Sequence, residues 1–340
     1  MPDRPLHTSL HLENFTAFTD ARFEFVPGVN VFVGENGTGK THAMKVLYAA
    51  ERFYSSGAPK RETILGRVFG TDDGAELIRL GAGGQESRAS GEFCSAPWRY
   101  TLHGRGYGGQ FKPAPKKALQ RPVFIPATDM MGHSKGFLAA NNEVVLDFDL
   151  TYIDIVTLLG LERRNESGQN GRASKLSAVI EGSIAYNETT GRFYLVTQNG
   201  RLAMPMVAEG VRKVATLVRL LDNGWLQPGS TLLWDEPEVN LNPKLMDEVV
   251  GAILALARSG VQVFLATHSY VILKELDLQA GPSDSVRYFA FEPTENGTKI
   301  NPSEDLAALR PNPILDQYDS LYDRDLTRAT GRSRNGEPVR

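Results

Sequence analysis

The feature that most constrains this chain is a glycine-rich segment placed between an apolar run and a helical pattern. Residues 29–33 are rich in β-branched and aromatic side chains, and the run stops at Gly34. From 41 to 54, Met44, Leu47 and Tyr48 have the spacing of one buried helix face. We therefore expect a strand, a glycine loop and a helix, a connection whose backbone N–H groups can surround an anion.

The loop itself fits the pattern G-x-x-x-x-G-K-[ST] at every fixed position. Glycines let the backbone approach phosphate oxygens, Lys40 offers a point charge to the β and γ phosphates, and Thr41 offers Mg²⁺ a hydroxyl ligand. The segment predicts ATP and Mg²⁺ as cofactors. The predicted nucleotide-binding residues are Gly34, Asn36, Gly37, Thr38, Gly39, Lys40 and Thr41.

A second apolar run, 231–234, ends in two carboxylates, Asp235 and Glu236. A buried strand that delivers an aspartate to its C-terminal edge places it near the phosphate loop, so Asp235 is predicted to hold Mg²⁺ together with Thr41. Glu236 is predicted to orient or deprotonate the attacking water. Glu238 is left open between a site residue and a surface carboxylate.

A third apolar run, 263–266, leads into Thr267 and His268. A histidine at the exit of such a strand can hydrogen-bond the γ-phosphate, and we assign His268 a catalytic role. The remaining histidines have no second ligand nearby in the sequence, so we predict no separate metal site from them.

Composition limits the cellular context. The chain has 340 residues, 41% of them hydrophobic, and a formal charge of −3, so any contact with DNA or RNA must come from a local basic patch. A single cysteine, Cys94, excludes an internal disulfide and favours the cytoplasm. We expect no membrane association, because no stretch of about 18 apolar residues occurs.

The remaining pattern predicts an α/β protein with parallel strands in its second half. Two antiparallel strands are expected from alternating runs at 10–18 and 23–25, with Gly224 ending a later helix as its C-cap. Further strands are predicted at 76–80, 98–102, 122–126, 231–234 and 261–266, helices at 144–161, 207–223 and 243–257, a polar turn at 139–143, a loop at 163–172, and hairpins around 189–192 and 199–200.

The order of these motifs resembles the ABC-type ATPases of the SMC, RecF and OLD group, in the compact AAA branch found in bacteria and phages. Residues 12–18 (LENFTAF) resemble that group's opening strand, and 235–243 (DEPEVNLNP) resemble its extended Walker B motif and D-loop. The resemblance implies an ABC-ATPase-type P-loop fold with an N-terminal antiparallel β layer and an inserted helical lobe. It implies an ATPase head at 1–54 and 176–310, an inserted lobe at 55–175 and a C-terminal tail at 311–340.

The same resemblance identifies residues 208–213 (AEGVRK) as the family's signature, which in one protomer closes on the ATP of the other. It implies that Ala208, Glu209 and Gly210 contact nucleotide and that ATP drives a head-to-tail dimer. Ala208 occupies the usual serine position, so we expect slow hydrolysis. The alternative is a plain amphipathic helix. The family's Q-loop glutamine is missing, and Thr128 or Asp129 is expected to face the metal in its place.

Three functions fit these motifs. The first is an ATP-switched dimer that controls a nucleic-acid transaction or a partner effector such as a nuclease or toxin, in anti-phage defence or DNA maintenance. The alternatives are the nucleotide-binding subunit of an ABC transporter and an OLD-like nuclease, for which Asp323 and Asp325 are the best acidic pair, more simply explained as surface charges. Candidate contacts to nucleic acid or a partner, or else a solvated face, are Lys135, Arg163, Arg164, Arg172 and Lys175.

Overall fold

A six-stranded sheet forms the centre of the computed structural model. The order of its strands is β14-β13-β3-β12-β11-β7, and all are parallel except β14, which runs antiparallel to β13. The strands are β3 (Val29–Gly34), β7 (Val123–Ile125), β11 (Thr231–Asp235), β12 (Gln262–Thr267), β13 (Val286–Thr294) and β14 (Gly297–Ser303). The structure describes residues 4–56, 63–82, 84–113, 120–142, 148–161 and 176–330.

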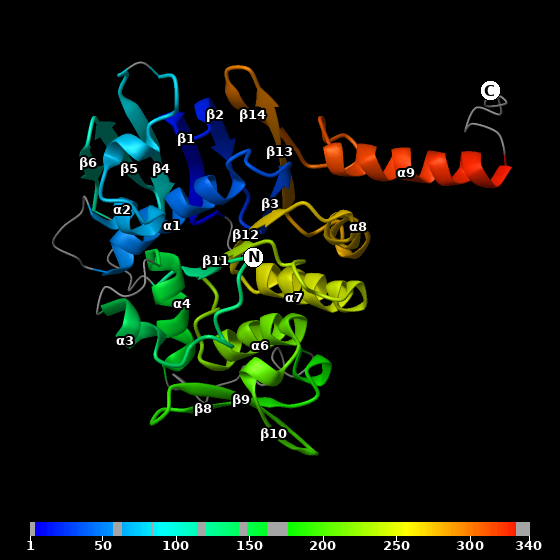
Figure 1. Cartoon of the computed structure of the whole chain (residues 1–340). Coiled ribbons are helices and arrows are strands. Elements are labelled where there is room, and N and C mark those ends of the chain that lie inside the picture. The colour runs from blue at the N-terminus through cyan, green and yellow to red at the C-terminus, as the bar shows by residue number, and fades with distance from the viewer. Residues whose placement is uncertain are drawn as a thin grey trace.

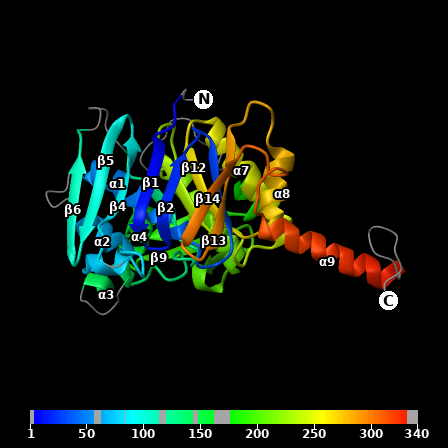
Figure 2. The ribbon, with the colours of Figure 1, turned by 90° about the horizontal axis from the view of Figure 1, so that it is seen from above.

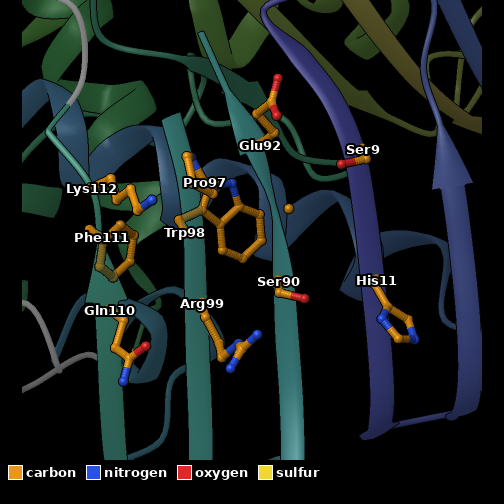
Figure 3. Close-up of a pocket in the computed structure, with 11 residues that line it drawn as sticks. Ser9, His11, Ser90, Glu92, Pro97, Trp98, Arg99, Gln110, Phe111 and Lys112 are labelled. Atoms are coloured by element: carbon orange, nitrogen blue, oxygen red, sulfur yellow. The ribbon is translucent and has the colours of Figure 1, made fainter. Parts of the chain in front are cut away.

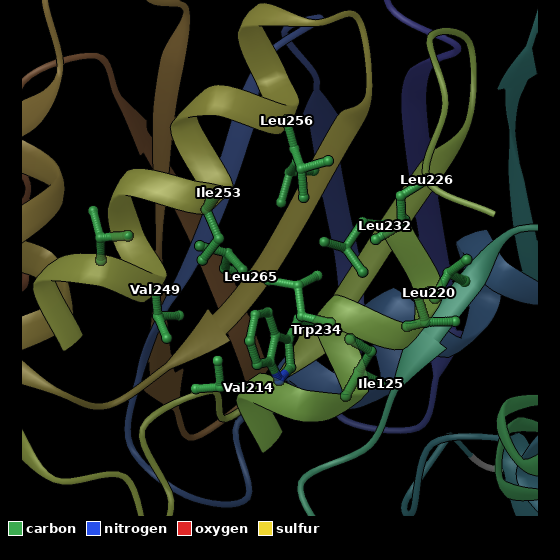
Figure 4. Close-up of a cluster of buried hydrophobic side chains, with 14 of the residues drawn as sticks. Ile125, Val214, Leu220, Leu226, Leu232, Trp234, Val249, Ile253, Leu256 and Leu265 are labelled. Carbon is green, nitrogen blue, oxygen red and sulfur yellow. The ribbon is translucent and has the colours of Figure 1, made fainter. Parts of the chain in front are cut away.

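Alternate residues of these strands enter two different hydrophobic cores, because successive side chains of a strand point to opposite faces. Val31 and Val33 pack on one face with helices α6 (Glu209–Asp222), α7 (Met246–Arg258) and α8 (Tyr270–Gln279). Figure 4 shows this aliphatic core around Trp234, with side chains from α6 and α7. The other face carries phenylalanines, including Phe32, that pack against α1 (Lys40–Ser56) and an N-terminal sheet.

That second sheet has five antiparallel strands in the order β2-β1-β4-β5-β6, as Figure 1 shows beside α1. Its strands are β1 (His7–Phe15), β2 (Phe18–Glu24), β4 (Ser87–Phe93), β5 (Ala96–His103) and β6 (Gly106–Phe111). The N-terminal antiparallel layer is thus confirmed. Strands of the predicted lobe are shared between the two sheets, since β4 to β6 extend this layer while β7 lies in the central sheet. The division into head, lobe and tail stays a prediction.

Two local predictions are wrong. The strand expected at 76–80 is largely a 3₁₀ turn, η1 (Gly74–Leu77), because the side chain of Asp73 accepts a hydrogen bond from the N–H of Ala75 at 2.9 Å and caps it. The polar turn expected at 139–143 is occupied by a helix, α3 (Phe137–Asn142).

The helix predicted at 144–161 is observed as α4 (Leu150–Gly160), which Asp149 caps by accepting from the N–H of Thr151 at 2.8 Å. Residues 144–147 of that prediction, like the loop at 163–172, lie outside the described residues. A short helix, α2 (Thr63–Phe69), lies between α1 and β4 in the chain.

Both predicted hairpins are present in a small sheet of β8 (Ser183–Asn187), β9 (Arg192–Thr197) and β10 (Gly200–Ala203), which precedes α6. The C-terminal segment contains a helix that the sequence reading missed, α9 (Pro313–Thr330), and Figures 1 and 2 show it projecting from the body. Near its start, Tyr318 stacks on Tyr270 of α8 with the ring centroids 4.3 Å apart.

Candidate functional site

Three strand ends meet at one edge of the central sheet. Strands β3, β12 and β11 are parallel neighbours in that order, so their C-terminal residues Gly34, Thr267 and Asp235 lie along the same edge. This is the edge at which open α/β sheets bind ligands. The fold therefore brings the glycine loop together with the two later motifs, which end at Asp235 and His268.

The glycine loop encloses the side chain of Lys40. Lys40 is 6% exposed, and its ammonium donates to the carbonyl oxygens of Gly34 and Glu35, both at 2.8 Å. Burial lowers the pKa of Lys40 below its usual value, and the nearby carboxylates of Glu236 and Asp235 oppose that change. Within the loop, Thr38 is buried and donates to the same Glu35 carbonyl, whereas Asn36 is exposed.

Gly39 shows why this loop requires glycine. Its φ of +94° lies in a region that side chains disfavour, and a Cβ there would meet the ring of Phe18 at 2.7 Å. Phe18 begins β2, so the β1–β2 hairpin packs directly on the loop. The opening strand that resembled the ATPase group thus supports the glycine loop.

Thr41 and Asp235, the two residues predicted to hold Mg²⁺, form a direct hydrogen bond, with the hydroxyl donating to Oδ2 at 2.8 Å. Asp235 is 7% exposed, and its Oδ1 is buried with no hydrogen-bond partner in the described part of the chain. Burial raises the pKa of Asp235 to about 6, against the opposing effects of the Thr41 hydrogen bond and Lys40. A hydroxyl beside a carboxylate with an unpaired oxygen is a donor set that suits Mg²⁺.

Glu236 follows in a left-handed backbone conformation, with φ +48°. Its N–H donates to the carbonyl of Ala266 on β12 at 2.9 Å. The carboxylate is partly exposed and lies 3.5 Å from Nδ1 of His268, so the two residues assigned to catalysis are adjacent.

Glu238 is a buried residue of this edge and not a surface carboxylate. It is 8% exposed, and its Oε1 accepts from the hydroxyl of Thr267 at 2.8 Å and from the N–H of His268 at 2.9 Å. The same oxygen lies 3.6 Å from Nδ1 of His268. Glu238 therefore holds the loop that carries this histidine.

The signature-like segment begins α6, with Ala208 exposed as an N-cap that makes no side-chain hydrogen bond. Gly210 packs tightly on the D-loop of the same chain, because a Cβ there would lie 2.7 Å from the carbonyl oxygen of Asn240. Among the described residues, no hydrogen bond joins Ala208, Glu209 or Gly210 to the glycine loop. Their predicted role toward a second protomer stays a prediction.

The expectation that Thr128 or Asp129 faces the metal stays a prediction, and the structure shows which groups Asp129 contacts in this chain. Its carboxylate accepts from Nε of Arg212 at 2.6 Å and from the N–H groups of Met131 and Gly132 at 3.2 and 3.0 Å, so it ties α6 to the segment after β7. Thr128 is exposed, and its side chain hydrogen-bonds Tyr152 of α4.

The sequence analysis placed Arg212 and Lys213 in the signature-like segment and Asp129 near the metal, but it did not predict that Arg212 pairs with Asp129 or that Lys213 contacts Glu236. A possible signal was present: Lys213 precedes Val214 and Leu217 on an otherwise apolar helix face, where a lysine needs a specific polar partner.

The basic residues predicted to contact nucleic acid or a partner do not form a cluster among the described residues. Lys135 is exposed after β7, while Arg163, Arg164, Arg172 and Lys175 lie outside the described residues. Asp323 and Asp325 are on α9, and the described residues contain no cluster of three or more His, Cys, Asp or Glu side chains able to hold a metal ion.

A separate pocket of about 530 Å³ lies on the solvent-facing side of the five-stranded sheet, as Figure 3 shows. It mixes polar side chains such as Arg99 and Glu92 with the edges of Trp98 and Phe111. None of its residues belongs to the predicted site. Among the helices that the structure describes, none combines the length and apolar character required to cross a bilayer.

Two segments of the chain match known protein families. Residues 134–274 match the family described as "AAA domain, putative AbiEii toxin, Type IV TA system", and residues 9–50 match one described as "AAA domain". The chain is also 44% identical over 41 residues to the DNA replication and repair protein RecF of Limosilactobacillus reuteri (strain DSM 20016). That match spans 12% of this chain and only 11% of the relative.

Solved structures with a similar fold are SMC head domains. A crystal structure of an SmcHead bound to the C-winged helix domain of ScpA matches 90% of this chain and 100% of its own, with a TM-score of 0.59 and 11% identity. A Pyrococcus furiosus Smc head with an extended coiled coil, bound to the C-terminal domain of ScpA, matches 95% of this chain and 100% of its own (TM-score 0.57, 11% identity). The SMC head of Thermotoga maritima matches 88% of this chain and 99% of its own, with a TM-score of 0.51 and 12% identity.

At these identities, the similarity to SMC heads shows the fold alone. Of the two segments that match AAA domains, residues 9–50 contain the glycine loop and residues 134–274 contain the Asp235 and His268 motifs. The chain therefore combines a fold similar to that of SMC head domains with two segments that match AAA-domain families and a short segment similar to RecF.

Proposed function

We propose that this protein binds ATP with Mg²⁺ at the edge formed by β3, β12 and β11 and hydrolyses it. The observation that carries the proposal is the pair of Thr41 and Asp235, joined at 2.8 Å beside a buried carboxylate oxygen without a partner in the described residues. Lys40, whose ammonium is held by two loop carbonyls at the same place, supplies positive charge for the phosphates. When bound, Mg²⁺ neutralises charge that develops on the phosphate oxygens.

In this proposal Glu236 accepts the proton of the attacking water, and His268 donates a hydrogen bond to the γ-phosphate. The support is their separation of 3.5 Å at the same strand edge. Glu238 keeps the backbone of His268 in place through the 2.9 Å hydrogen bond to its N–H.

We further propose that ATP draws two copies into a head-to-tail dimer, with Ala208, Glu209 and Gly210 of each copy facing the nucleotide of the other. The exposed N-terminus of α6 supports this, since helix N–H groups and the helix dipole favour bound phosphate. The dimer would act as a switch for a partner effector or a nucleic-acid transaction, in anti-phage defence or DNA maintenance. That step rests on the AbiEii-type and RecF relatives.

A pair of variants tests the proposal. Glu236→Gln keeps the shape and hydrogen-bonding reach of the side chain but removes the base, so ATP and Mg²⁺ should bind without turnover and the closed dimer should accumulate. Lys40→Ala should neither bind nor hydrolyse ATP. Light scattering coupled to size exclusion should show a nucleotide-dependent doubling of mass in Glu236→Gln only.

Hydrolysis by purified Lys40→Ala at the wild-type rate would refute the assignment of the site. A Glu236→Gln protein that stays monomeric at saturating ATP and Mg²⁺ would refute the head-to-tail dimer while leaving ATP binding intact.

A further inference from the structure

Lys213 is a buried lysine that the proposed reaction does not yet use. It is 2% exposed, although lysine side chains are almost never fully buried without a partner. In the described part of the chain its only hydrogen bond runs from Nζ to the main-chain carbonyl oxygen of Glu236, at 3.0 Å, and it makes no ion pair within 4.0 Å. Burying an ammonium costs several kcal/mol of stability, and one hydrogen bond to a carbonyl does not offset that cost.

The carbonyl that Lys213 holds belongs to a strained residue. Glu236 has a φ of +48°, a left-handed conformation that non-glycine residues adopt at a cost on the order of 1 kcal/mol. On one side its N–H donates to Ala266 of β12, and on the other its carbonyl accepts from Lys213 of α6 at 3.0 Å and from the N–H of Val239 at 3.2 Å. The direction of the Glu236 carboxylate depends on this backbone conformation.

The carboxylates around Lys213 favour its charged form, which burial disfavours. Burial lowers the pKa of Lys213, while the carboxylates of Glu238, Glu209 and Glu236 oppose the change. Two further contacts hold the start of α6. Gly210 packs closely against the carbonyl of Asn240, and Arg212 forms an ion pair with Asp129. Lys213 therefore projects from a rigid helix end toward the loop that it holds.

We propose that Lys213 is a positioning residue for hydrolysis, which holds the carbonyl of Glu236 and so fixes the left-handed backbone that directs the Glu236 carboxylate. This rests on the proposed role of Glu236 as the base. It also assigns the signature-like helix a function within its own chain, in addition to any contact with a second protomer.

The decisive variant is Lys213→Met, which has a similar unbranched side chain and removes the ammonium. We expect kcat to fall about ten- to a hundred-fold, as for a catalytic group displaced by roughly an ångström, with the dissociation constant for ATP unchanged. The unfolding midpoint should change little, because the variant removes a buried charge and the Glu236 carbonyl keeps its hydrogen bond from the N–H of Val239. Lys299→Met, at an exposed position of β14, is the matched control and should leave all three quantities unchanged.

A double-mutant cycle tests whether Lys213 acts through Glu236. In the Glu236→Gln background, Lys213→Met should cause no further loss of single-turnover hydrolysis, because the base is already missing. An equal fold-loss in both backgrounds, or a wild-type kcat in Lys213→Met, would overturn the proposal.

A crystal structure of Lys213→Met decides the question even if the wild type proves not to hydrolyse ATP, in which case the proposed function fails separately. The proposal requires that Glu236 leave its left-handed conformation and that its carboxylate move away from His268. A structure with Glu236 unchanged would overturn it.

Discussion

At the scale of residues, the site gathers charges at places where burial disfavours them. Lys40, Lys213, Asp235 and Glu238 are each less than a tenth exposed, and two of the four carry a carboxylate oxygen that has no partner in the described residues. Such groups destabilise a fold unless a ligand completes their contacts, so stability and function are opposed at this edge.

Asp235→Asn is expected to stabilise the metal-free protein. The folded-state pKa of Asp235 is raised to about 6 from 3.8, so the stability that its protonated form contributes is present below pH 4 and is lost as the pH rises through 6. At pH 7.5 the ionised side chain costs on the order of 1 to 3 kcal/mol, which asparagine avoids. Urea unfolding in EDTA should show this gain.

The gain of Asp235→Asn over the wild type should shrink toward pH 4.5, where the wild-type carboxyl is protonated. Asp316→Asn, at an exposed position on α9, is the control and should show no such pH-dependent difference. A metal-free Asp235→Asn protein that is less stable than the wild type at pH 7.5 would contradict the prediction.

At the scale of elements, helix α1 is joined to α4 by two pairs of charged side chains. Lys45 donates to Asp149 at 2.7 Å, and Arg52 donates to Asp154 at 2.6 Å. Asp154 also accepts from the hydroxyl of Tyr48 at 2.6 Å. Since α1 begins at Lys40, these contacts fix the helix that carries the glycine loop.

Asp154→Ala should lower the free energy of unfolding by about 3 kcal/mol, because it leaves the buried guanidinium of Arg52 without its carboxylate. Asp154→Asn should lose less, since its amide oxygen can still accept the Tyr48 hydroxyl. Denaturant midpoints of the two variants provide the measurement, and equal losses would show that the charge of Asp154 is not what matters.

At the scale of the whole molecule, the central sheet separates two cores of different character. One face is mainly aliphatic under α6, α7 and α8, and the other is rich in phenylalanine between α1 and the N-terminal sheet. Helix α9 belongs to neither beyond its first turns, because Leu321 and Tyr322 are 50% and 62% exposed.

A chain that ends after Asp319 should therefore fold and bind nucleotide normally. It keeps the buried Ile314 and the stacked Tyr318 but loses the exposed turns of α9. We expect the melting temperature to stay within about 2 °C of the full-length value, the shift for less than 1 kcal/mol in a large domain. A loss of more than about 5 °C would show that the distal part of α9 supports the fold.

Much of the architecture follows from short-range patterns. The alternating runs at 10–18 and 23–25, the apolar runs before Gly34, Asp235 and Thr267, and the Asn-Gly turn at 199–200 all predicted elements that the structure contains, although Phe18 begins β2 and does not belong to β1. The error at 76–80 falls where a capping side chain, that of Asp73, overrides local propensity. Helix α9 was not predicted, since residues 313–330 were assigned to the C-terminal tail.

The sequence by itself determined the phosphate loop and its chemistry, because eight consecutive residues contain all the groups that the motif requires. Only the tertiary structure decided that Asp129 pairs with Arg212, 83 residues away, that Asp154 pairs with Arg52, 102 residues away, and that Lys213 holds Glu236. Such partners depend on how the helices pack against the sheet. The sequence shows only that a charged residue needs a partner if it is buried. The packing of the fold decides which group that partner is.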